Sequence, residues 1–76
     1  PLEDVFHACF RRPDNKEEGD WLTAAEMFRI MIKRNASALR GISAKQLSFR
    51  LTAMGFTPKH TRHGNCYEVV HQGTSL

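Results

Sequence analysis

The chain has 76 residues, of which 41% are hydrophobic and 25% are charged, and its formal net charge at pH 7 is +3. This length suits one small domain, and the composition excludes an intrinsically disordered chain. No apolar run is long enough to cross a membrane and no signal-peptide pattern opens the sequence, so we expect no membrane partner.

The first predicted element is a helix over residues 2–12, within a first segment 1–12. Apolar residues recur there at helical spacing until Pro13 ends the pattern. Residues 13–20 follow as an acidic loop that contains Pro, Asn and Gly. A short edge strand is expected at Asp20–Leu22, where the chain becomes apolar again.

A second helix is predicted over residues 23–34. Thr23 and Glu26 have the spacing of a capping box, in which each side chain satisfies a backbone N–H group of the other residue. Lys33 and Arg34 stand in the last turn, where the helix dipole favours positive charge.

A third helix is predicted over residues 43–54. Ser43 and Gln46 repeat the capping box at its start, and Gly55 is a natural stop after its last turn. The connection between the second and third helices is longer than the roughly three- to four-residue turn of a compact helix-turn-helix. This length fits a winged variant of that motif.

Residues 56–71 alternate as a β-hairpin around a two-residue turn at His63–Gly64, in which glycine supplies a positive φ. If these two residues form the whole turn, Lys59 lies opposite Glu68, a favourable cross-strand charge pair. The same register places four apolar side chains on the core face: Phe56, Pro58, Tyr67 and Val69.

These elements predict an α+β fold of the winged helix-turn-helix type, with three helices and a small antiparallel sheet. Residues 21–71 form its helix–helix–wing part, and residues 72–76 are a tail. The predicted core consists of Phe6, Phe10, Leu22, Phe28, Ile32, Leu47, Leu51, Phe56, Tyr67 and Val69.

The charge of the chain is unevenly distributed. Residues 1–20 contain six acidic and three basic side chains, a balance of −3, whereas residues 21–76 contain two acidic and eight basic ones, a balance of +6. A basic segment of this kind attracts polyanions such as nucleic acid, although many soluble domains are mildly basic without such a role.

The two cysteines, Cys9 and Cys66, lie near opposite ends of the chain. Small secreted domains usually carry several cysteine pairs, so two distant thiols favour reduced residues in a cytoplasmic protein. A long-range disulfide between them is the alternative.

The outer face of the 43–54 helix is the first candidate site. In a helix-turn-helix protein the corresponding helix enters the major groove, where Lys, Arg and Gln side chains read base edges. Phe49 at the centre of this face has three interpretations: contact with thymine methyls or an unpaired base, packing inside the fold, or a protein-binding patch. The candidate residues on this helix are Lys45, Gln46, Phe49 and Arg50.

The tip of the hairpin is the second candidate site. Positive and hydrogen-bonding side chains on a protruding turn suit contact with phosphates, which fixes orientation without reading sequence. A polar turn without a ligand is the alternative interpretation. The candidate residues here are Lys59, Thr61, Arg62, His63 and Asn65.

The sequence predicts neither a metal site nor catalysis. His60, His63 and Cys66 resemble half of a zinc site, but no second closely spaced pair of ligands completes it. The chain also lacks a phosphate-binding glycine-rich loop, paired acids in an apolar setting, and a nucleophile with an evident base. We therefore expect no cofactor, no small-molecule substrate and no enzymatic activity of the fragment itself.

Four motifs carry a resemblance to a known family: WLTAAE at 21–26, RGIS at 40–43, LTAMGF at 51–56 and RHGNCY at 62–67. The chain resembles a bacterial family of C-terminal domains of unknown function, found in proteins similar to virulence-associated protein E and to primase-helicases. The resemblance implies a winged helix attached to neighbouring domains of a larger, ATP-driven replication or mobile-element protein. The first residue, Pro1 rather than Met, agrees with a piece of a larger chain.

Together these observations predict a non-catalytic nucleic-acid-binding domain that favours DNA. The alternative is a protein–protein interaction or oligomerisation module of the same parent protein, in which Phe49 and the acidic residues 1–20 hold a neighbour.

Overall fold

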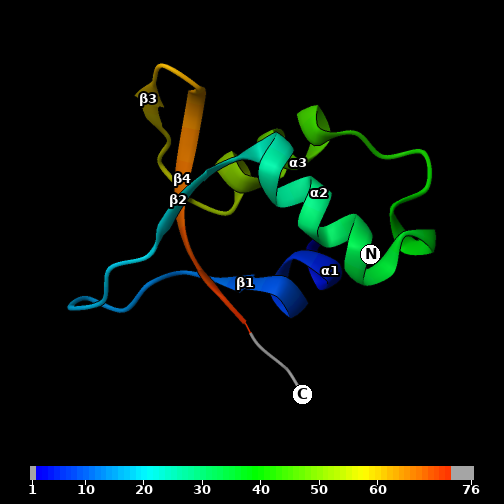
Figure 1. Ribbon diagram of the computed structural model, residues 1–76, viewed down its shortest axis with the longest axis horizontal. Helices are drawn as coiled ribbons and strands as arrows, with labels where there is room; N and C mark the ends of the chain where they lie inside the picture. Colours follow the sequence, from blue (N-terminus) through cyan, green and yellow to red (C-terminus); the bar gives the residue numbers. More distant parts are fainter. Residues whose placement is uncertain (1, 73–76) are drawn as a thin grey trace.

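The computed structural model describes residues 2–72, so most of the predicted tail at 72–76 lies outside the described residues. The described part of the chain contains three α-helices and one four-stranded antiparallel sheet, an α+β fold compatible with a winged helix. The helices lie to one side of the strands (Figure 1). In chain order the elements are α1 (Leu2–Cys9), β1 (Phe10–Arg11), β2 (Asp20–Thr23), α2 (Ala24–Asn35), the 3₁₀ turn η1 (Ser37–Leu39), α3 (Ala44–Ala53), β3 (Lys59–Thr61) and β4 (Gly64–His71).

Both predicted capping boxes are confirmed. At the start of α2, the Glu26 backbone N–H donates to Thr23 Oγ1 at 3.1 Å, and the Thr23 backbone N–H donates to Glu26 Oε1 at 2.8 Å. At the start of α3, Ser43 and Gln46 make the same two bonds at 3.4 Å and 2.8 Å. These local contacts fix where the two helices begin.

The predicted end of the third helix is also confirmed. Gly55 has a φ of +94°, a left-handed conformation that glycine adopts without steric cost. The Phe56 backbone N–H then donates to the carbonyl of Leu51 at 3.0 Å. Arg12 donates to the carbonyl of Met54 at 2.8 Å, so a distant side chain satisfies one of the acceptors left at the helix end.

The first helix is shorter than predicted, because α1 ends at Cys9 and the chain continues as strand β1. Phe10 pairs with His71 and Arg11 with Val70 at the far end of β4. The prediction of helix up to residue 12 is therefore wrong at its end. Residues 10 and 11 form backbone hydrogen bonds with β4, which is about 60 residues away in the sequence. The helical periodicity of residues 2–12 contains no information about this distant pairing.

The loop after β1 is held by a two-bond ion pair. Arg11 donates to both carboxylate oxygens of Glu17, at 2.8 Å and 2.7 Å. Together with a bond from the backbone N–H of Asp14, this pair lowers the pKa of Glu17 from its ordinary value of 4.5 to about 2. The acidic loop is thus tied to the edge of the sheet.

Strand β4 lies in the middle of the sheet, with β1 and β2 on its two sides. Cys66 of β4 is the register partner of both Lys59 in β3 and Thr23 in β2, so β3 and β2 also lie on opposite sides of β4. The strand predicted at Asp20–Leu22 is confirmed and extends by one residue.

The hairpin register differs from the predicted one. Thr61 lies opposite Gly64, so the two turn residues are Arg62 and His63, both with negative φ, and Gly64 follows them with a φ of +109°. Two turn residues followed by a glycine in the left-handed conformation form one of the common hairpin connections, which is counted as a three-residue loop. The register is therefore shifted, Lys59 faces Cys66, and the predicted pairing of Lys59 with Glu68 is wrong.

Most of the predicted core is confirmed. Six of the predicted residues are buried: Phe6, Phe10, Leu47, Leu51, Tyr67 and Val69. Leu22, Phe28 and Phe56 are half-buried against this cluster. Ile32 is 40% exposed, and its prediction as a core residue is wrong. Helix α2 buries Met27 and Met31, so Ile32 lies outside the buried stripe of this helix.

The connection between α2 and α3 also contributes to the core. It contains η1, whose Leu39 is buried, so its additional length is filled by an ordered turn. No helix in residues 2–72 is long and apolar enough to cross a membrane.

Candidate nucleic-acid interface

Helix α3 is attached to the core by one face, which leaves the opposite face exposed. Leu47 and Leu51 are buried, and Ser48 Oγ lies 2.9 Å from the hydroxyl oxygen of Tyr67 on β4. This hydrogen bond and the two leucines fix the rotation of the helix about its axis. The four predicted site residues on α3 are all exposed as a result: Lys45, Gln46, Phe49 and Arg50.

Phe49 has the most exposed large hydrophobic side chain in the described residues, at 64% of its surface. The Nζ atom of Lys45 lies 6.0 Å from the centre of its ring, one helical turn away. The interpretation of Phe49 as a residue packed inside the fold is therefore wrong. An exposed ring with a neighbouring cation remains on the outer face of α3.

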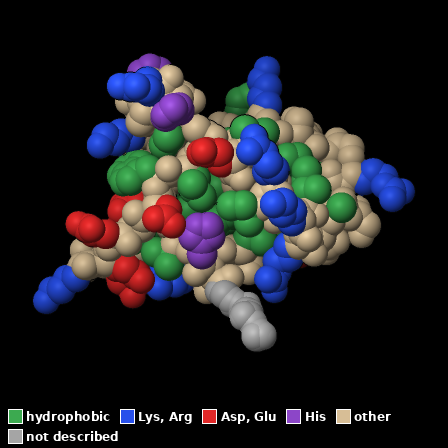
Figure 2. Space-filling view, viewed as in Figure 1, with side chains coloured by type: hydrophobic (Ala, Val, Ile, Leu, Met, Phe, Trp, Pro, Cys, Tyr) green, Lys and Arg blue, Asp and Glu red, His purple; other side chains and the backbone are tan. Residues whose placement is uncertain are grey.

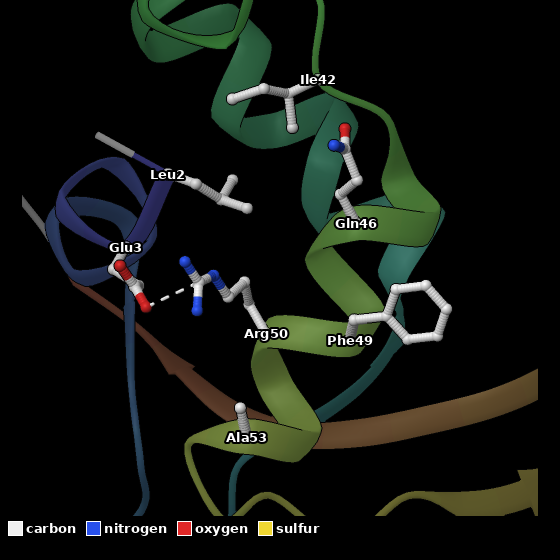
Figure 3. Close-up of a pocket in the computed structure, with 7 residues that line it drawn as sticks. All are labelled: Leu2, Glu3, Ile42, Gln46, Phe49, Arg50 and Ala53. Atoms are coloured by element: carbon white, nitrogen blue, oxygen red, sulfur yellow. Dashed lines mark ion pairs between the residues drawn. The ribbon is translucent and has the colours of Figure 1, made fainter.

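Gln46 and Arg50 are partly occupied by contacts within the domain. The side-chain oxygen of Gln46 accepts the bond from the Ser43 backbone N–H, so the helix cap fixes its orientation and takes one of its two lone pairs. Arg50 extends toward α1, where its Nε lies 3.6 Å from Glu3 Oε2, whereas the Phe49 ring points to the other side of α3 (Figure 3).

A shallow groove runs between α1 and α3. Its floor is mainly apolar, with Leu2 from α1, Ile42 before α3, and Ala53 at the end of α3. The ion pair between Arg50 and Glu3 crosses it (Figure 3). The groove is open to solvent, and its two charged lining residues, Glu3 and Arg50, are paired with each other.

In the hairpin, Thr61 has a structural role. Its hydroxyl donates to the carbonyl of Gly64 at 2.9 Å and accepts the backbone N–H of His63 at 3.1 Å. These two bonds hold the turn. Since the hydroxyl is already engaged, Thr61 positions its neighbours and is not itself an open contact group.

Four other predicted residues of the hairpin are exposed: Lys59, Arg62, His63 and Asn65. The side chain of Asn65 is bonded to His60 Nδ1 at 3.1 Å. At the start of α2, the pKa of Glu26 is lowered, mainly by the backbone N–H of Thr23 and in a smaller part by the charge of His63.

In the space-filling view the acidic side chains gather on one side of the molecule, whereas Lys and Arg side chains are spread more widely (Figure 2). Lys, Arg and His side chains cover the hairpin at the upper left, whereas Asp and Glu side chains lie below it, over the acidic loop (Figure 2). The sequence asymmetry of charge is therefore also a spatial one on this side of the molecule.

Trp21 is a candidate residue that the sequence reasoning missed. It is 44% exposed on β2, and Lys59 Nζ lies 5.3 Å from the centre of its ring. The alternation of a strand gave a usable signal: Trp21 and Leu22 are adjacent, so only one of them can face the core. Leu22 packs against the core and Trp21 faces outward.

The residues that resembled half of a zinc site do not converge. Cys66 is buried with its Sγ 3.5 Å from Thr61 Oγ1, and His60 is engaged by Asn65. Within residues 2–72 no group of three or more His, Cys, Asp or Glu side chains is arranged to hold a metal ion.

No curated protein and no solved structure matches it. One family profile, described as a domain of unknown function from B. theta (DUF3874), matches residues 1–69, which is most of the chain. The chain therefore belongs to the DUF3874 family of domains of unknown function.

Proposed function

We propose that this domain is a non-catalytic nucleic-acid-binding module that favours DNA and uses α3 and the β3–β4 hairpin as its contact surface. The observation that carries the proposal is the exposed basic hairpin, on which Lys59 and Arg62 have no ion-pair partner among the described residues. Cations without an ion-pair partner on a protruding hairpin suit phosphate oxygens, and Lys45 adds to the positive field.

The same proposal covers the setting of the domain. As an accessory module of a cytoplasmic primase-helicase or of a protein similar to virulence-associated protein E, it would hold nucleic acid for a catalytic domain elsewhere in its parent protein. The family match supports a shared domain of unknown function, and the resemblance in sequence motifs supports this finer assignment.

The test is a fluorescence anisotropy titration of labelled DNA with three proteins. The double variant Lys59→Ala/Arg62→Ala should bind about ten- to hundredfold more weakly than wild type near 0.1 M salt, because two phosphate contacts are lost. The control, Lys33→Ala/Arg34→Ala, also removes two positive charges, but from the last turn of α2, outside the proposed contact surface. It should bind like wild type. Equal affinity of the hairpin variant and wild type would exclude the hairpin as the contact surface.

Substitution of Lys45 and Gln46 distinguishes recognition of particular DNA sequences from electrostatic attraction to any DNA. If these residues contact base edges, Lys45→Ala and Gln46→Ala should change the relative affinity for different DNA sequences. The hairpin variant should instead weaken binding to all sequences alike.

A second candidate function is a protein-interaction or oligomerisation module. The observation that favours it is the 64% exposure of Phe49 beside the groove between α1 and α3. An interaction module should leave the anisotropy of labelled DNA unchanged in the titration. It should instead bind itself or a partner protein, and Phe49→Ala should abolish that binding.

A further inference from the structure

We infer that the domain binds nucleic acid as a single strand, with unpaired bases stacked on Trp21 and Phe49. This inference rests on the proposed function and names the form of its ligand.

The first observation is the kind of apolar side chain that the fold leaves exposed. Among the described residues, the exposed large hydrophobics are Trp21, Ile32 and Phe49, two of which are aromatic. Each ring has a lysine ammonium near its centre, Lys59 at 5.3 Å and Lys45 at 6.0 Å. In both pairs the ammonium lies over the ring. A nucleotide can use both groups of such a pair, because its phosphate draws the ammonium away while its base stacks on the ring.

The second observation is how the sheet assembles one of these pairs. Trp21 lies opposite Glu68 on β4, and the residues on either side of Glu68, Tyr67 and Val69, are buried against the helices. Successive side chains of a strand alternate between faces, so Trp21 lies on the face of the sheet away from the helices. Lys59 reaches the same ring from β3, on the other side of β4. Two strands distant in sequence thus build one stacking position.

The third observation is that α3 is poorly equipped to read a duplex. The oxygen of Gln46 caps its own helix, Arg50 is directed to Glu3, and the centre of the exposed face is the ring of Phe49. A major groove offers base edges, which require hydrogen-bonding partners. A single strand offers the faces of its bases, and every base can stack on an aromatic ring.

The charged residues around Trp21 limit where the strand can run. Glu68 lies opposite Trp21, and the shallow depression beside its ring is lined by Asp14, by Arg12 and by Glu17, which is paired with Arg11. Charges of both signs thus meet on that side. Lys59 and Arg62 have no ion-pair partner in residues 2–72, so the sugar–phosphate backbone runs on their side of the ring, toward the tip of the hairpin.

The test uses the fact that Trp21 is the single tryptophan of the chain, so its fluorescence reports on this position alone. Oligothymidylate should quench this fluorescence on binding, whereas a blunt duplex of the same length should bind more weakly and quench little. Oligouridylate in a third titration shows whether the preferred strand is DNA or RNA, and tighter binding of either strand than of the duplex supports the inference.

The matched variants measure the contribution of each ring by anisotropy with labelled oligothymidylate. Trp21→Ala and Phe49→Ala should each lower the affinity by about five- to hundredfold, the range expected for loss of one stacked base. Trp21→Phe should retain most of the affinity. Ile32→Ala removes a side chain of similar exposure from α2 and should bind like wild type.

The possible results distinguish this inference from the proposed function. Duplex binding at least as tight as single-strand binding, with Trp21→Ala and Phe49→Ala unaffected, overturns the single-strand inference and leaves the proposed function standing. Absence of binding to any of the three nucleic acids, in a protein whose circular dichroism shows it to be folded, overturns both.

Discussion

At the scale of single residues, Gly19 shows how closely the acidic loop approaches the sheet. Its backbone N–H donates to Glu68 Oε2 at 2.9 Å. A Cβ atom at this position would lie 2.6 Å from the backbone oxygen of Val69, closer than a carbon and an oxygen can approach without displacement. The loop can lie against β4 here only because glycine has no side chain.

Substitution of this glycine should therefore destabilise the domain. Gly19→Ala must push the loop away from β4 or break its bond to Glu68, and overpacking of this kind costs about 1–3 kcal/mol. The free energy of unfolding in urea measures the effect. Glu18→Ala, at the exposed neighbouring position, is the control and should unfold at the wild-type midpoint. A wild-type midpoint for Gly19→Ala would contradict the close approach.

At the scale of elements, the helices begin where their own sequences specify, whereas other boundaries depend on partners. The residues of a capping box are three positions apart, so the sequence contains the whole motif, and both starts were predicted correctly. The end of α1 and the register of the hairpin were not. The first depends on β4, and the second on a turn in which the glycine stands after the two turn residues.

Removal of either N-cap side chain should lower the free energy of unfolding by a measurable amount. Thr23→Ala and Ser43→Ala each remove a side-chain acceptor from a helix start, which costs about 1 kcal/mol in typical cases. Thermal or urea unfolding followed by circular dichroism compares each variant with Thr57→Ala, which alters an exposed threonine between α3 and β3. A loss for Thr57→Ala as large as that for the caps would show that the loss does not arise from capping.

At the scale of the whole molecule, the distribution of charge matters more than its sum. The net charge is only +3, yet residues 1–20 carry −3 and residues 21–76 carry +6. In the fold the acidic loop and the basic hairpin occupy separate parts of the surface (Figure 2). This separation predicts that a bound polyanion is attracted to one region and repelled from another, and so takes a defined orientation.

This charge distribution predicts a steep dependence of nucleic-acid affinity on salt. Each phosphate contact releases counterions, so the logarithm of the binding constant should fall linearly with the logarithm of the salt concentration. Lys59→Ala/Arg62→Ala should flatten this slope by about one to two units, and Lys33→Ala/Arg34→Ala should leave it unchanged. Anisotropy titrations at four salt concentrations measure both slopes. A common slope for wild type and the hairpin variant would show that these two residues do not contact phosphate.

In the candidate site, some features of the residues follow from the local sequence and others from contacts between distant segments. Exposure of Lys45 and Arg62 agrees with the sequence, because polar turns and the outer faces of amphipathic helices follow from periodicity, whereas the sequence left the burial of Phe49 open. Sequence did not reveal that Thr61 is engaged by its own turn or that Arg50 is directed to Glu3. Such contacts depend on which groups the fold brings within reach.

The sequence by itself determined the order of the three helices and the hairpin, both helix starts, the end of α3 and the burial of six of the ten predicted core residues. Each of these depends on residues within a few positions of one another. The tertiary structure alone decided the end of α1, the exposure of Ile32 and the hairpin register. It also placed Trp21 beside Lys59, two residues that are far apart in sequence. These features arise from pairing and packing between distant segments, whose free energy is absent from any local pattern.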